Sequence, residues 1–130
     1  MKFLLWLPVA VYMAAIFYVS AQSNPPAPGG VPDYILHGVE YAVLSVLTFR
    51  ALSGGLPSRL SQARVWLTLA ITVGYGVTDE LHQLFVPFRT ADIRDVAYDL
   101  AGALLGLAAC WAWNIISGSE ARIPTTRSRR

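Results

Sequence analysis

Four apolar stretches separated by short polar segments form the basic pattern of this chain. They cover residues 3–21, 34–52, 65–86 and 95–116. Each is close to the roughly 20 residues that a helix needs to cross the hydrocarbon core of a bilayer. Proline and glycine, which break helices, crowd the segment between the first two. The pattern predicts an all-α integral membrane protein: a bundle of four transmembrane helices within residues 1–117 and a basic tail at 118–130.

The first apolar stretch has an alternative interpretation. Lys2, the apolar run and the small residues around Ser20 are also typical of a secretory signal peptide. The run is long for the apolar region of such a signal, and Tyr12, Phe17 and Tyr18 are bulky for one. A transmembrane helix is therefore favoured, and the signal peptide stays open as the alternative.

Composition agrees with a membrane protein. Hydrophobic residues make up 55% of the chain and charged residues only 14%, against roughly 25% charged residues in a soluble domain. The net charge of +2 is modest, and the arginines lie at helix ends and in the tail, so we expect no nucleic-acid partner. The single cysteine, Cys110, excludes an internal disulfide.

Basic residues fall mainly on one side of the predicted bundle. With a cytoplasmic N-terminus and four crossings, eight of the ten Lys and Arg residues lie on the cytoplasmic side. Only Arg89 and Arg94 lie on the outer side. This bias matches the positive-inside rule, so both termini are expected in the cytoplasm.

Acidic residues show the opposite distribution. Seven of the eight fall on the outer side, and both histidines join them. These nine residues are Asp33, His37, Glu40, Asp79, Glu80, His82, Asp92, Asp95 and Asp99. An ionisable group within a span costs about 2.5 to 3.5 kcal/mol on insertion scales, and it usually faces the bundle interior or a wet cavity. We therefore expect a polar site that opens outward.

Helical spacing places these residues on converging faces. Positions 33, 37 and 40 share one face of the second helix, which Tyr41 continues, and positions 76, 80 and 83 share one face of the third. In the fourth helix, the acidic stripe at positions 92, 95 and 99 continues to Gly102 and Gly106, whose spacing favours close helix packing. The candidate ligand-binding residues are His37, Glu40, Tyr41, His82, Gln83, Arg89, Asp95 and Asp99.

Two adjacent carboxyl groups, Asp79 and Glu80, form a candidate catalytic acid/base pair. Crowding two carboxylates in a low-dielectric cavity favours protonation of one of them, which supplies a proton donor. Arg89 suits a phosphate or carboxylate, or else pairs with the acidic residues to lock its loop. The oxygen and nitrogen atoms of the cluster also suit a divalent metal, but the spacing is not that of a recognised metal motif. Metal and cofactor are therefore unknown.

Residues 20–106 resemble the VanZ-like family of small bacterial membrane proteins, which is named after a teicoplanin-resistance accessory protein. The longest shared stretch is Tyr75-Gly-Val-Thr-Asp-Glu-Leu-His-Gln-Leu-Phe-Val-Pro-Phe-Arg89, followed by Asp95, Asp99, Gly102 and Gly106. His37-Gly-Val-Glu-Tyr41 and Ser20-Ala-Gln22 are similar to two further family segments.

The chain also departs from the family pattern at three positions. Gly38 stands where an aromatic residue is usual, and Phe88 stands where glycine is usual. Tyr34 replaces a basic residue that many members carry after the residue matching Asp33, which weakens the case for Asp33 as a site residue. The resemblance implies a multi-pass protein of the bacterial cytoplasmic membrane.

Three functions remain open at this level. The first is an outward-facing site that binds or modifies an anionic lipid-linked or cell-envelope molecule, with a link to glycopeptide (teicoplanin) susceptibility implied by the resemblance. The second is a non-enzymatic scaffold whose polar cluster is structural, with a membrane-protein partner or a homo-oligomer. The third is a small transporter or proton-conducting protein. Membrane lipids are expected partners in each case, and no complete catalytic signature decides whether the protein is an enzyme.

Overall fold

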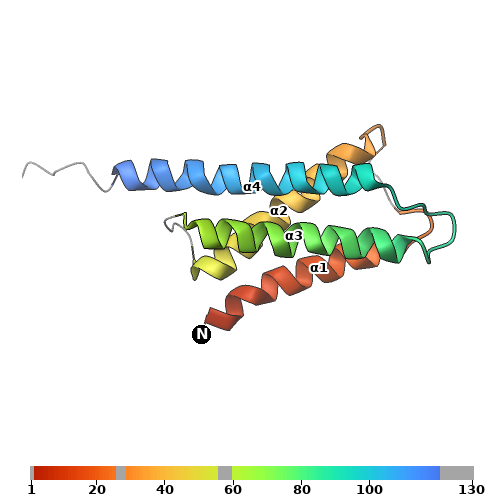
Figure 1. Ribbon diagram of the computed structural model, residues 1–130, viewed down its shortest axis with the longest axis horizontal. Coiled ribbons are helices and arrows are strands. Elements are labelled where there is room, and N and C mark those ends of the chain that lie inside the picture. The colour runs from red at the N-terminus through yellow and green to blue at the C-terminus, as the bar shows by residue number, and fades with distance from the viewer. Residues whose placement is uncertain (1, 26–28, 56–59, 121–130) are drawn as a thin grey trace, which may run out of the picture.

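The computed structural model describes residues 2–25, 29–55 and 60–120. This part of the chain is all-α (Figure 1). A short 3-10 helix, Lys2–Trp6, leads into α1, Leu7–Ser20. The remaining helices are α2, Asp33–Ser53, α3, Gln62–Gln83, and α4, Ile93–Glu120. The predicted all-α architecture is confirmed.

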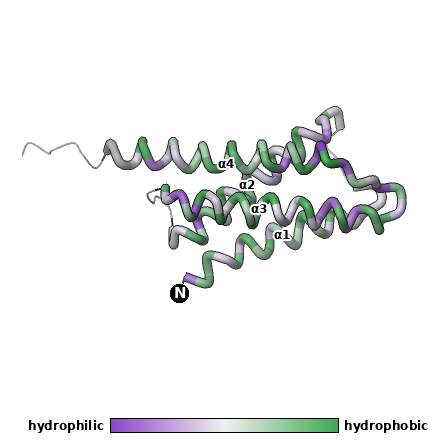
Figure 2. The backbone as a smooth tube through the Cα atoms, viewed as in Figure 1, coloured by the Kyte–Doolittle hydropathy of each residue, from purple (hydrophilic) through white to green (hydrophobic). Residues whose placement is uncertain are grey.

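Three of these helical stretches are long and apolar enough to cross a membrane: Lys2–Ser20, Asp33–Ser53 and Ile93–Ser117. Figure 2 shows apolar residues along most of their length. Helix α3 has 22 residues and is long enough, but it does not reach the same hydropathy. Its buried face explains this, because that face carries Thr68, Thr72, Asp79, Glu80 and Gln83. A membrane protein with three candidate spans is supported, and the fourth span stays a prediction.

The helix ends differ from the expected bounds for local reasons. Helix α3 ends at Gln83, three residues before the expected position, and turns follow it. Pro87 has no backbone N–H, so it cannot continue the helical hydrogen bonds. Helix α4 runs to Glu120, past the expected end at 116, and the rest of the predicted tail lies outside the described residues. Gly54 ends α2 with a φ of 74°, a left-handed conformation that glycine adopts without strain.

Helices α2 and α4 pack closely along a seam of small residues. The backbone carbonyl of Gly38 on α2 lies directly over Gly102 on α4, and that of Ala42 lies over Gly106. A side chain at either glycine would collide with these carbonyls. Ser45 also donates a 2.8 Å hydrogen bond from Oγ to the backbone oxygen of Ala103. This seam holds the two helices that carry most of the acidic residues.

Helix α1 covers the opposite side of α2. Val9 and Ile16 of α1 join Tyr41 and Leu44 of α2 in one buried apolar cluster. The hydroxyl of Tyr75 on α3 donates a 2.6 Å hydrogen bond to the backbone oxygen of Met13, which ties α1 to α3 as well. The end of α1 is thereby held beside the polar ends of α2 and α3.

Candidate functional site

The polar residues gather at one end of the bundle. Helices α1 and α3 end there, and α2 and α4 begin there (Figure 1). Lys2 lies beside Gly54 at the other end of the bundle, where α2 ends and α3 begins. The acidic segments of three helices, far apart in the sequence, therefore meet in one region.

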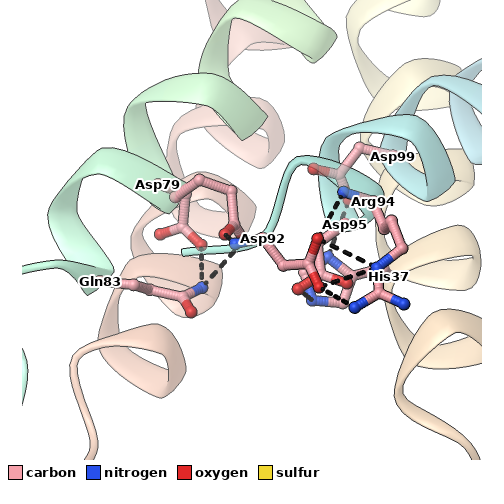
Figure 3. A network of polar contacts seen from close by, with 8 residues as sticks. His37, Asp79, Gln83, Asp92, Arg94, Asp95 and Asp99 are labelled. Carbon is pink, nitrogen blue, oxygen red and sulfur yellow. Dashed lines mark hydrogen bonds and ion pairs between the residues drawn. The ribbon is translucent and has the colours of Figure 1, made fainter. Parts of the chain in front are cut away.

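The best-defined contact in this region joins α2 to α4. Nδ1 of His37 lies 2.9 Å from Oδ1 of Asp99, and both residues are buried (Figure 3). A carboxylate only accepts hydrogen bonds, so the ring donates from Nδ1. On the other side of the ring, Nε2 lies 4.0 Å from Oδ2 of Asp95, which is too long for a hydrogen bond. The predicted convergence of His37 with the acidic stripe of α4 is thus present in the structure.

A second network joins α3 to the start of α4. Oε2 of Glu80 accepts a 2.9 Å hydrogen bond from the backbone N–H of Asp92. Gln83 lies between the two acidic residues, with its Nε2 3.3 Å from both Oδ2 of Asp79 and Oε1 of Glu80 (Figure 3). The Glu80 side chain is therefore engaged in holding the loop that leads to α4.

Asp92 caps the N-terminus of α4. Its Oδ1 accepts a 2.9 Å hydrogen bond from the backbone N–H of Arg94, and its Oδ2 lies 2.9 Å from the Arg94 guanidinium. The hydrogen bond from the Arg94 side chain holds the pKa of Asp92 below its ordinary value. The side chain of Arg94 is 77% exposed, so this ion pair lies at the surface, beside the N-terminus of α4.

A cavity of about 290 Å³ opens between α1, α2 and the end of α3. It is lined by Ile16, Val19, Ser20, Pro25, Asp33, Leu36, His37, Glu40, Asp79, Gln83 and Arg89. Three of its polar groups have no hydrogen-bond partner among the described residues: Oγ of Ser20, Oδ1 of Asp79 and Nε of Arg89, all fully buried atoms. The cavity thus combines an apolar wall from α1 with an ionisable wall from α2, α3 and the loop before α4.

Not every candidate residue lies in this cavity. His82 packs against Phe17 of α1, with ring centroids 4.4 Å apart, and does not line the cavity. Tyr41 is buried beneath His37, and its ring lies parallel to the imidazole. Glu80 faces a separate small pocket formed with Ala91 and neighbouring residues. The candidate residues that do line the cavity are His37, Glu40, Asp79, Gln83 and Arg89.

Three positions contribute more to this region than their sequence context indicated. Asp33 lines the cavity and lies near His37 and Asp95, although Tyr34 had weakened the case for it. Ser20 also lines the cavity, and its place in the Ser-Ala-Gln segment was an available signal. Gly76 allows Oδ2 of Asp99 to lie against α3, because a Cβ atom there would come within 2.5 Å of it.

The chemistry of the cavity suits an amphiphilic ligand with a charged group. The guanidinium of Arg89 matches the geometry of phosphate and carboxylate oxygens. The unpartnered oxygen of Asp79 accepts a hydrogen bond from a hydroxyl or amine, or donates one when it is protonated. Ile16, Val19 and Leu36 offer apolar contact beside these polar groups.

Comparison with known proteins assigns the chain to a family. The VanZ/LLP1 family model matches residues 1–115, which covers all four helices up to the last turns of α4. Searches of curated proteins and of solved structures found no match. The family match agrees with the resemblance carried by the Asp79 to Arg89 segment and with the apolar helices. The chain therefore belongs to the VanZ/LLP1 family of membrane proteins.

Proposed function

We propose that the cavity binds the anionic group of a lipid-linked or cell-envelope molecule from the outer face of the bacterial cytoplasmic membrane. The observation that carries this proposal is the buried, unpartnered Nε of Arg89 in the cavity wall. A buried polar group without a partner costs about 1–3 kcal/mol, and more when it is charged. A bound phosphate or carboxylate supplies that partner.

The contrast between the two outer arginines supports this role for Arg89. Arg94 is exposed and its guanidinium is already paired with Asp92. Arg89 lies five residues earlier, on the cavity wall, with half-buried side chain. The two residues have the same chemistry and almost the same place in the chain, so only their surroundings distinguish them.

The cavity wall also favours a ligand with an apolar part. Ile16 and Val19 come from α1, which is itself a candidate membrane span. A lipid-linked molecule would place its chain along this wall and its head group near Arg89 and Asp79. Binding comes first in this proposal, and Asp79 is the candidate acid or base for any chemistry on the head group.

The proposed orientation rests on four crossings. Helix α3 lies among three candidate spans and turns its polar face inward, so its low hydropathy is compatible with a span surrounded by other helices. With four crossings both termini face the cytoplasm, the basic residues follow the positive-inside rule, and the cavity opens outward. A link to teicoplanin susceptibility belongs to the same proposal, because glycopeptides act on cell-wall precursors outside this membrane.

The test is native mass spectrometry of the protein released gently from its own membrane. We expect the wild type and Arg94→Gln to retain a specific anionic adduct, and Arg89→Gln to lose it. Arg94→Gln is the matched control, because it removes the same charge only five residues away, from the first turn of α4. Equal adducts on all three proteins would contradict the proposal.

A structural role for the polar cluster is the second candidate, and the contact between Glu80 and Asp92 favours it. Glu80→Ala removes the acceptor for the Asp92 N–H, and Glu80 is not among the residues that line the cavity, so this variant tests the structural role. Under the scaffold function, Glu80→Ala and Asp79→Asn would both lose folded protein. Under the binding function, Asp79→Asn folds normally and alters the bound adduct.

A further inference from the structure

The proposed anion site carries an electrostatic conflict. Three carboxyl groups, those of Asp33, Glu40 and Asp79, line the same cavity as Arg89. Ionised carboxylates repel a phosphate, and the repulsion is strong where the dielectric constant is low. Among the described lining residues, Arg89 is the only arginine or lysine, and it faces three carboxyl groups. A second positive group near the cavity would resolve the conflict.

The structure brings together suitable ligand atoms for a cation at the edge of this cavity. Three residues, Asp33, His37 and Asp95, each offer one ligand atom, and these three atoms lie within 4.8 Å of one another. They come from the first turn of α2, the second turn of α2 and the first turn of α4. Two carboxylates and one imidazole form a donor set for divalent cations such as Mn²⁺ and Zn²⁺.

A separate observation points the imidazole at this position. His37 is only 8% exposed, and its Nδ1 is occupied by the buried Asp99 carboxylate at 2.9 Å. Nε2 therefore faces Asp95 and makes no hydrogen bond to another described residue. Metal-binding histidines almost always donate their second ring N–H to a carboxylate or carbonyl in this way, which fixes the ring and the tautomer. Asp99 is not one of the three candidate ligands, so its contact orients the His37 ring independently of them.

We propose that Asp33, His37 and Asp95 bind a divalent cation of the Mn²⁺ or Zn²⁺ class, which together with Arg89 receives a phosphate or pyrophosphate head group. The phosphate part of this inference rests on the proposed function, whereas the cation part stands on the three ligands and Asp99. The cation bridges the acidic edge of the cavity to the anion, and Arg89 contacts the anion from the loop before α4.

The test uses the purified full-length protein in nanodiscs of zwitterionic lipid, stripped of metal with a chelator and then titrated with Mn²⁺. Electron paramagnetic resonance reports the free ion, and Zn²⁺ competes in a second titration. We expect saturable binding of one ion per chain. Asp33→Asn and Asp95→Asn should each weaken it about 10-fold or more, and Asp99→Asn should weaken it within the roughly 10- to 100-fold range of outer-shell changes.

Asp92→Asn is the matched control, because it removes a neighbouring carboxylate that is not one of the three ligands. Asp33 is exposed, so Asp33→Asn is expected to fold even if a change at His37 does not. Absence of saturable binding by the wild type, or equal binding by the wild type, Asp33→Asn and Asp95→Asn, would overturn the inference.

A second arm separates this inference from the proposed function. The titration is repeated in nanodiscs that contain phosphatidic acid, and separately with inorganic phosphate in solution. Ion binding without any phosphate-dependent change supports the cation site and counts against the anionic ligand. Retention of a native anionic adduct by chelator-treated protein that binds no ion supports the anionic ligand and overturns the cation site.

Discussion

Nδ1 of His37 on α2 lies 2.9 Å from Oδ1 of Asp99 on α4, and both residues are buried. The contact spans 62 residues of sequence and lies just above the glycine seam where the same helices touch. One hydrogen bond therefore does two things: it joins the helices that form the site, and it aims Nε2 of His37 at the neighbouring carboxylates.

The first prediction concerns this hydrogen bond. Asp99→Ala removes the acceptor and leaves the buried Nδ1–H of His37 without a partner, which costs about 1–3 kcal/mol. Asp99→Asn keeps a side-chain oxygen of the same shape and should cost less. Thermal unfolding in detergent, followed by circular dichroism, measures both variants. Equal stability of Asp99→Ala and Asp99→Asn would show that the contact contributes nothing.

The second prediction concerns the seam between α2 and α4. Gly102→Ala places a methyl group against the backbone of Gly38, so the helices must move apart, at about 1–3 kcal/mol for overpacking. Gly74→Ala on α3 is the control, because its new methyl group meets nothing within 4 Å and alanine favours a helix by about 1 kcal/mol. The free energy of unfolding should fall for Gly102→Ala and rise for Gly74→Ala. A shift of the same sign for both variants would contradict the account of the seam.

The third prediction concerns the loop between α3 and α4. Phe88 has a φ of 64° and its side chain is 96% exposed, so it is in a left-handed conformation with little packing of its own. This conformation costs a residue other than glycine about 1–2 kcal/mol. Phe88→Gly should therefore be more stable than Phe88→Ala, which keeps the backbone strain. The melting temperatures of Phe88→Gly and Phe88→Ala test this difference. A lower melting temperature for Phe88→Gly would show that the strain is absent.

The fourth prediction concerns the number of crossings. In a Cys110→Ser background, a cysteine at Thr90 should react with a membrane-impermeant maleimide added outside intact cells. A cysteine at Ala63 should react only after the membrane is opened, because α3 separates the two positions. Labelling of both positions from outside would contradict four crossings.

Much of the site was predictable from helical spacing. The i, i+4, i+7 pattern from Asp33 correctly placed His37 and Glu40 on one face, and the acidic stripe of α4 led to the contact with Asp99. These predictions succeeded because the polar side chains of a membrane helix must turn toward its neighbours. The chain's membership of the VanZ family, expected from the Asp79 to Arg89 segment, is confirmed.

Other features were not readable from spacing. Asp79 and Glu80 are adjacent in sequence, but Asp79 lines the cavity and Glu80 accepts a hydrogen bond from the Asp92 N–H. This difference depends on the loop after Pro87, which folds back and brings Asp92 to Glu80. Likewise, Arg89 and Arg94 differ only in what surrounds them. His82 follows the acidic pair in sequence but points to α1, because neighbouring helical residues are about 100° apart around the axis.

Photo-crosslinking within the membrane detects whether an anionic amphiphile occupies the cavity beside Arg89, as proposed. A photoreactive amino acid is placed at Leu36, on the cavity wall, or at Leu105, on the exposed apolar surface of α4. We expect the probe at Leu36 to capture a phosphate-bearing lipid species that the probe at Leu105 does not. Arg89→Gln should abolish this capture, and Arg94→Gln should preserve it. The same mixture of lipids at both positions, unchanged by Arg89→Gln, would contradict the proposal.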